Sequence, residues 1–319
     1  MLAAVAVAAG GTAVEAQAAA SAKSTSFGPA VITDVPKTPE KGDATQKVVP
    51  LGTISTELRK GKTAYVYSTV TANNADHVNL IDNEVRCSGA GRADVVMGEN
   101  VFPRNSGSPL REITVVTRFL VTATSAGKLT CEQFLRTSST SEFVSRETVR
   151  SEMRFASEDV IGDVNGVALQ RSLPHGNTPV NPSATTPVLS GKIPAGLKQL
   201  AVIADVAYHR CNGCSATVRF ALDVKTSGGA NCPSAPVARI ERTVQPGINH
   251  LAVPLYTKFP LKAGCTDFKA QVTSTTVAGD PGNIGGAAPG LCDTTGLNNC
   301  RAPQKNHESA MTHIFAVPS

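Results

Sequence analysis

Apolar and polar residues alternate with a period of two along several segments of this chain. Between residues 113 and 123, Ile113, Val115, Phe119 and Val121 share one face, and Val218, Phe220, Leu222 and Val224 do the same between residues 217 and 225. Further alternation occurs at 64–72, 200–208, 251–259 and 268–272. This pattern is typical of half-buried antiparallel strands, and no segment shows convincing helical periodicity. The sequence therefore predicts an all-β fold.

The second half of the chain resembles the first. Cys131 stands in Ala-Gly-Lys-Leu-Thr-Cys-Glu-Gln-Phe and Cys265 in Lys-Ala-Gly-Cys-Thr-Asp-Phe, an offset of 265 − 131 = 134. The predicted strand around Val66 aligns with that around Val202 at an offset of 202 − 66 = 136. We interpret these similar offsets as an internal duplication, and chance similarity between short strands is the alternative.

This organisation predicts two tandem antiparallel β-sandwiches of the immunoglobulin-like kind, each with about six to eight short strands. The expected segments are a signal peptide (1–18), an extended arm containing Pro, Ser and Lys (19–47), a first sandwich (48–164), a linker (165–183) and a second sandwich (184–319). The Gly-rich stretch 278–299 is expected to be an exposed loop without strands, and a last strand is expected near 311–317.

The first residues predict export. They are small and apolar and lead to Ala16-Gln17-Ala18, a signal-peptidase pattern, although no positive residue precedes Lys23, which suggests that the true start lies upstream. The Ala-rich leader and the body rich in Thr, Val and Gly are typical of a secreted bacterial protein. The expected location is extracellular.

An even number of cysteines in an exported chain predicts disulfides. The repeat suggests that Cys87 pairs with Cys131 and Cys232 with Cys265, which leaves two local pairs, Cys211 with Cys214 and Cys292 with Cys300. Cys-x-x-Cys at 211–214 is alternatively a redox motif or half a zinc site. Strand-like residues on both sides of it favour a structural disulfide.

The sequence offers no catalytic constellation. It contains no Gly-x-Ser-x-Gly nucleophile motif, and the six histidines are scattered. Around His307, Glu308 and His313 the spacing differs from His-Glu-x-x-His, so a zinc protease site is not expected. We therefore predict no catalytic residue, no metal site and no cofactor.

Composition argues against several partners. A net charge of +5 spread over a chain with only 17% charged residues does not favour nucleic acid. No apolar run is long enough to span a bilayer as a helix. The absence of Trp and an aromatic content of 4% give little material for stacking surfaces.

The function expected from these observations is non-catalytic: a secreted binding, adaptor or structural protein. Its partner would be an unidentified extracellular protein or cell-surface polymer, within a larger secreted assembly. We expect the arm to become ordered only on a partner, through Phe27, Val31, Ile32 and Val35.

Two alternatives stay open. A carbohydrate-binding module or hydrolase accessory protein would need at least two of Tyr65, Tyr67, Tyr208 and Tyr256 exposed on one face. A secreted hydrolase would need His77 or His209 beside an acid and a hydroxyl.

Overall fold

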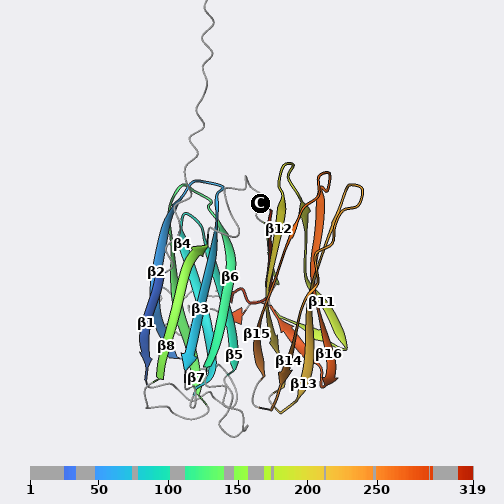
Figure 1. The fold of residues 1–319 in the computed structure, drawn as a ribbon. Coiled ribbons are helices and arrows are strands. Elements are labelled where there is room, and N and C mark those ends of the chain that lie inside the picture. The colour runs from blue at the N-terminus through green and yellow to red at the C-terminus, as the bar shows by residue number, and fades with distance from the viewer. Residues whose placement is uncertain are drawn as a thin grey trace, which may run out of the picture.

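The computed structural model describes most of the chain as antiparallel β-structure. The described residues are 25–33, 47–73, 78–100, 112–139, 147–156, 169–173, 176–211, 213–246, 249–286, 288–289 and 308–318. Among these residues there is no helix. The predicted signal peptide and the cysteines Cys292 and Cys300 lie outside them. Two sandwiches stand side by side (Figure 1).

The first sandwich contains eight strands in two four-stranded sheets. One sheet has the order β1-β8-β3-β6 and the other the order β2-β7-β4-β5. The strands are β1 (Thr25–Ile32), β2 (Lys47–Leu58), β3 (Thr63–Asn73), β4 (Val78–Gly89), β5 (Ala93–Asn100), β6 (Glu112–Thr122), β7 (Gly127–Ser139) and β8 (Glu147–Ala156).

The second sandwich repeats this arrangement. One sheet contains β10-β17-β12 with β15 on β12, and the other has the order β11-β16-β13-β14. Two further strands, β20 and β9, extend the first of these sheets along β12. The strands are β9 (Leu169–Ser172), β10 (Asn177–Val180), β11 (Ser183–Lys192), β12 (Gln199–His209), β13 (Ala216–Ser227), β14 (Ala238–Val244), β15 (His250–Pro260), β16 (Asp267–Gly279), β17 (Gly282–Gly285) and β20 (His313–Pro318); a short pair, β18 (Ala288–Pro289) and β19 (Glu308–Ser309), lies apart.

The two sandwiches share one topology. Numbered from one to eight within each sandwich, the strands pair as 1-8-3-6 and 2-7-4-5 in both. The predicted pair of disulfide-stapled antiparallel sandwiches is confirmed. The topology adds a detail that strand spacing could not supply, because this order is that of a jelly roll rather than the ABED and CFG order of an immunoglobulin domain.

A bulge recurs at the equivalent position in the two sandwiches. In β2 the pairing with β7 shifts between Pro50 and Gly52, and in β11 the pairing with β16 shifts between Thr185 and Val188. Leu51 is left out of the first ladder, and Thr186 and Pro187 are left out of the second. Their offsets, 186 − 51 = 135 and 187 − 51 = 136, lie close to those seen in the sequence. Bulges occupy defined places in a fold, so this agreement supports a duplication.

Three expectations about loops are wrong. Residues 25–32, expected in an unpaired arm, form β1 on β8, and the expected linker contributes β9 and β10. The Gly-rich stretch contains β17, which pairs with β10 and β12. Sequence patterns missed these strands because each is short or interrupted by Gly and Pro, so too few residues remain to show alternation.

Each sandwich has its own apolar core between its sheets. In the second, Val218, Phe220, Leu222 and Val224 of β13 are buried, as their alternation predicts. β12 differs, because nearly all of its residues are buried. Its inner residues fill this core. Two of its outer residues, Ala201 and Ile203, belong instead to an apolar cluster at the joint between the sandwiches. The other members of this cluster are Tyr65 and Leu120 of the first sandwich and Phe315 and Val317 of β20.

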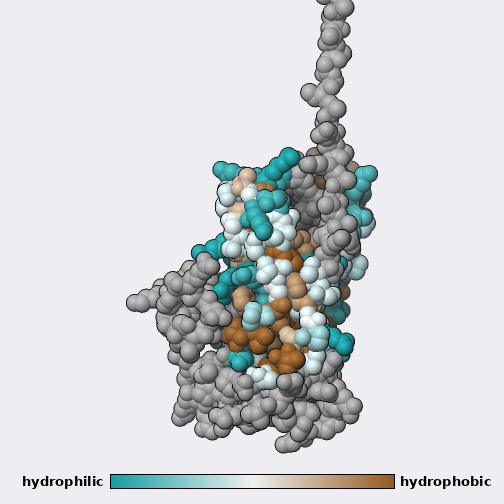
Figure 2. Space-filling view, turned by 90° about the vertical axis from the view of Figure 1, so that its left-hand side faces the viewer, coloured by the Kyte–Doolittle hydropathy of each residue, from teal (hydrophilic) through white to brown (hydrophobic). Residues whose placement is uncertain are grey.

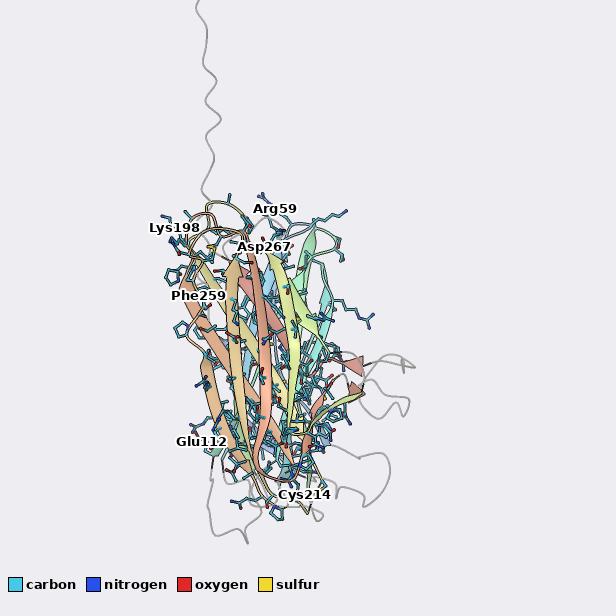
Figure 3. The ribbon with its side chains drawn as sticks, turned by 90° about the vertical axis from the view of Figure 1, so that its right-hand side faces the viewer. Arg59, Glu112, Lys198, Cys214, Phe259 and Asp267 are labelled. Carbon is cyan, nitrogen blue, oxygen red and sulfur yellow. A yellow bond between two sulfur atoms is a disulfide. The ribbon has the colours of Figure 1, made fainter. Side chains whose placement is uncertain are left out.

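Three disulfides stabilise the described chain, and their pairing is the expected one. Cys87 pairs with Cys131, directly opposite it on β7, while Cys232 pairs with Cys265 and Cys211 with Cys214. The two disulfides of the second sandwich lie at opposite ends of it. Figure 3 shows Cys214 at one end and Asp267, close in sequence to Cys265, at the other.

Candidate binding surface

The residues predicted to contact a partner lie at the open edge of the first sandwich, and most already have a place within the chain. Phe27 is half-buried and packs against the core, and Ile32 is only 1% exposed. Val31, in contrast, is 50% exposed. Val35 lies outside the described residues. Phe27 and Ile32 are therefore core residues, and the expectation that this segment waits unpaired for a partner is wrong.

Phe27 closes the gap between the two sheets at this edge. Its ring occupies the space that a Cβ atom on Gly52 of β2 would need. The Ser151 hydroxyl of β8 donates a hydrogen bond to the Phe27 carbonyl at 3.4 Å. β1 is thus anchored to both sheets, to β8 through backbone pairing and to β2 through one aromatic ring.

Beside this anchor lies an apolar area that we call the edge patch: Ala30, Val31, Val48, Val49 and Leu51. Val31 is exposed and the other four are half-buried. Figure 2 shows hydrophobic side chains gathered in the lower half of this side of the molecule, where β1 ends and β2 begins. Val49 and Leu51 also pack against the apolar core, so Val31 is the member of the edge patch that is most accessible to a partner. Apolar side chains left exposed at a strand edge can form an interaction site.

The two strands that border the edge patch are poor templates for strand addition. Pro29 in β1 and Pro50 in β2 lack backbone N–H groups, and both strands contain a register shift. Prolines and bulges at sheet edges block pairing with a further strand. A partner at this edge would therefore contact side chains rather than extend either sheet.

A shallow hollow of about 300 Å³ adjoins the edge patch on the outer face of the β1-β8-β3-β6 sheet. It lies where the β1 backbone bulges at Gly28 and Pro29, and the side chains of Thr69, Arg150 and Glu152 contribute to its lining. These groups supply hydroxyl, guanidinium and carboxylate functions with no net charge. The hollow can thus both donate and accept hydrogen bonds.

Polar contacts continue from the hollow along the same sheet. The Arg154 guanidinium lies over the Tyr67 ring, 4.7 Å from its centroid, and its Nε is 3.9 Å from Glu152. Thr71 and Thr114 share a hydrogen bond of 2.8 Å across β3 and β6. These contacts place a cation, an aromatic ring and two hydroxyl groups on the same sheet as the hollow.

The four tyrosines do not form an exposed aromatic platform. Tyr65 and Tyr208 are buried, and Tyr67 is half-buried beneath Arg154. Only Tyr256, at 44%, is exposed. The condition set for a carbohydrate-binding module, two exposed tyrosines on one face, is not met.

His209 does not occupy a catalytic setting. Its ring stacks on that of His250 with 5.8 Å between centroids, and burial lowers its pKa, the opposite of what an adjacent carboxylate would do. His77 lies outside the described residues, as does His307. Within the described ranges no three His, Cys, Asp or Glu side chains gather as a metal site would require, and no helix could cross a bilayer.

Sequence analysis missed a buried polar cluster at the joint between the sandwiches. Arg118 of β6 donates to Asp205 of β12 from Nε at 3.0 Å and from its backbone N–H at 2.9 Å. Burial opposes the charge on Asp205, but Arg118 and His313 outweigh it, so the pKa of Asp205 is lowered. The carboxylate therefore stays ionised, and the joint contains a charged pair that is shielded from water.

A second set of polar contacts lies at the rim of the joint. Glu99 of β5 pairs with Arg242 of β14 at 2.5 Å. Asn100 Oδ1 accepts hydrogen bonds from the backbone N–H groups of Asn249 and His250 at 2.9 and 2.7 Å. Polar groups thus fix the orientation of the sandwiches at two separate places.

The fold and these sites define a tandem jelly-roll protein with an apolar strand edge. No protein-family model matches the chain, and no curated protein matches it. Among solved structures, it is similar to one described as "The Triple Jelly Roll Fold and Turret Assembly in an Archaeal Virus", with 11% sequence identity and a TM-score of 0.21. The match covers 80% of this chain and 59% of that one. A similarity this low carries no functional argument.

Proposed function

We propose that this protein is a non-catalytic, exported binding protein that contacts an extracellular macromolecule through the edge patch and the adjoining hollow. The observation that carries the proposal is the exposure of Val31 in the middle of an apolar strand edge. Burying such a surface on a partner is favourable at roughly 25 cal/mol per Å² of apolar area. The neighbouring hollow supplies hydrogen-bonding groups that can orient the partner.

Two features of the chain support a role outside the cell. Three disulfides join cysteines within single sandwiches, which suits an oxidising compartment. The leader pattern ending at Ala18 predicts export to that compartment. Apolar and polar contacts join the two sandwiches, which suits an adaptor or structural component of a secreted assembly.

The test compares two single substitutions of exposed valines. Val31→Asp charges the edge patch, and Val277→Asp charges an equally exposed valine (46%) on β16 of the second sandwich. Both variants and the unmodified protein are immobilised and exposed to concentrated culture supernatant and to purified cell-wall polymer of the producing strain. We expect retention of the same component by the unmodified protein and by Val277→Asp, with loss in Val31→Asp. Equal retention by all three would contradict the proposal.

A further inference from the structure

Two neighbouring side chains at one end of the second sandwich contain buried hydrogen-bond donors without a partner. Among the described residues, Nε and Nη1 of Arg210 and the hydroxyl oxygen of Tyr208 make no hydrogen bond and are closed to solvent. The Arg210 side chain is fully buried although it carries a positive charge. A polar group in a protein interior is costly when it is unpaired, so these donors indicate a binding site.

The two side chains lie on the same face of the chain. Arg210 follows Tyr208 by two residues, and the Arg210 N–H donates to the Asn249 carbonyl oxygen at 3.0 Å, which extends the pairing of β12 with β15. Residues two apart on a strand point to the same side. The Tyr208 ring is buried in the core of the second sandwich. Arg210 thus lies at the end of this core, the end at which Figure 3 labels Cys214.

Arg210 is only partly balanced by negative charge. In its ion pair with Asp280, Nη2 is 3.4 Å from Oδ2, and the Asp280 side chain is 58% exposed. Asp280 also accepts a hydrogen bond from the Ser215 backbone N–H at 3.3 Å. Burial lowers the pKa of Arg210 more than Tyr208 and Asp280 raise it, but an arginine in a protein keeps its proton. A positive charge therefore remains at this end of the core, with two nitrogens to which Asp280 does not bond.

The donors define the chemistry of the ligand. A guanidinium N–H can only donate, and Tyr208 has its hydroxyl proton to donate, so the ligand must accept several hydrogen bonds. Hydrogen bonds between charged groups are the strong ones, and a negative ligand also balances Arg210. A water molecule supplies no charge and brings further donors of its own. These requirements favour an anion.

The packing around the Tyr208 hydroxyl favours a small ligand. A Cβ atom on Gly282 of β17 would lie 2.1 Å from this oxygen, so the hydroxyl lies against the β17 backbone. A halide ion occupies the volume of a single atom, whereas phosphate or sulfate would need a wider space at this end of the core.

At the equivalent position the first sandwich has an apolar residue. β3 and β12 occupy the same place in their sandwiches, and Ala72 is equivalent to Tyr208 at the offset 208 − 72 = 136. Ala72 is buried in an apolar core. The fold itself therefore accepts a methyl group at this position, and the hydroxyl of Tyr208 belongs to the second sandwich alone.

We propose that this end of the second sandwich binds one small anion of the size of chloride between Arg210 and Tyr208. The guanidinium donates from Nε or Nη1 and Tyr208 from its hydroxyl, and the negative charge balances Arg210. Because the anion binds the folded sandwich and not the unfolded chain, it stabilises the fold as its concentration rises. The site belongs to the second sandwich and the edge patch to the first, so this proposal is independent of the proposed function.

The first measurement is urea unfolding while sodium gluconate is replaced by sodium chloride at constant ionic strength. Urea is used because guanidinium chloride would itself supply the ion. Above the dissociation constant, each tenfold rise in chloride should increase the folding equilibrium constant by nearly tenfold. A folding equilibrium constant that chloride leaves unchanged in the unmodified protein would overturn the proposal.

Three variants locate the site. Arg210→Gln should lose the chloride dependence. Tyr208→Phe removes only the hydroxyl, so it should keep the fold and need more chloride for the same stabilisation. The control is Arg219→Gln, which removes an exposed arginine paired with Glu241 at 3.1 Å and should respond to chloride as the unmodified protein does. The same chloride dependence in Tyr208→Phe as in the unmodified protein would refute the proposal.

Crystallography with bromide shows the position of the ion directly. Bromide binds where chloride does, and its anomalous scattering distinguishes it from water. We expect a bromide peak within hydrogen-bonding distance of Arg210 and of the Tyr208 hydroxyl in the unmodified protein, and a weaker one in Tyr208→Phe. Bromide found only beside exposed basic side chains would mean an adventitious ion only and would contradict the proposal.

Discussion

The Phe27 ring of β1 occupies the space that a side chain on Gly52 of β2 would need. Because Gly52 has no side chain, the ring fits between the two strands and closes this edge of the first sandwich. The two residues belong to different sheets. This contact explains why a segment with the composition of a tether is an ordered strand.

Gly52→Val should separate β1 from the sandwich. The added side chain cannot share the space of the Phe27 ring, so we expect a loss of about 1 to 3 kcal/mol, typical of overpacking. Hydrogen exchange of residues 25–32 should rise more than exchange in the second sandwich. Gly213→Ala is the control, because a Cβ there meets no neighbour within 4 Å. Unchanged protection of β1 in Gly52→Val would show that the ring does not anchor it.

Asp205→Asn should weaken the joint. The amide keeps the shape of the carboxylate but leaves Arg118 buried without its counter-charge, which typically costs about 3 to 5 kcal/mol. Urea unfolding followed by circular dichroism should show the loss, with the two sandwiches unfolding less cooperatively. The matched control is Glu241→Gln, whose exposed pair with Arg219 should contribute less than about 1 kcal/mol. Equal effects of the two substitutions would argue against a structural role for the buried pair.

The sequence predicted strands well where one face of the strand meets solvent. β13 alternates because one sheet face is covered and the other is not, and Val218 and Phe220 were identified from that alternation. β12 and the second half of β6 are buried on both faces, since the sandwiches pack together there. Alternation within a single strand cannot reveal such a joint, because it depends on how two separate domains pack.

The sequence marks the two charged residues of the buried cluster but does not show that they pair. Arg118 interrupts the apolar run from Val115 to Val121, and Asp205 interrupts that from Leu200 to Tyr208. A charge within an apolar strand suggests a buried pair, since isolated charges are rarely buried. The partner lies 87 residues away, and nothing in the sequence selects it from the other charged residues.

Acid should weaken the rim of the joint through His250. Burial, with His209 beside it, lowers the pKa of His250 to about 4, below the ordinary 6.5. A base whose pKa is lowered by folding binds protons better when unfolded, so stability is complete above about pH 6.5 and falls as the pH drops toward 4. The full effect is about 3 kcal/mol. Thermal unfolding between pH 4 and 7 should show this slope in the unmodified protein and a smaller one in His250→Gln.

Glu84→Gln should change the stability of the protein at neutral and alkaline pH. An acid whose pKa is raised by folding retains its proton in the folded state, so its contribution to stability is lost as the pH rises from about 4.5 to about 8. The glutamine amide is neutral throughout and removes that loss. We expect Glu84→Gln to gain stability relative to the unmodified protein with increasing pH, as measured by urea unfolding at pH 5, 7 and 9. A parallel profile would show that Glu84 is ionised in the folded state.

The three disulfides should differ in what their removal costs. Their sequence separations are 44 for Cys87 and Cys131, 33 for Cys232 and Cys265, and 3 for Cys211 and Cys214. The chain-entropy model gives about 4 kcal/mol for each of the first two and about 2 kcal/mol for the third. Paired Cys→Ala variants compared by urea unfolding should follow that order. Mass spectrometry of the unreduced variants checks that the remaining bonds are unchanged. A loss for the Cys211 and Cys214 pair larger than about 2 kcal/mol would mean that this disulfide does more than restrict the unfolded chain. It would then also stabilise folded contacts at the end of the second sandwich, where Arg210 and Ser215 both donate hydrogen bonds to Asp280.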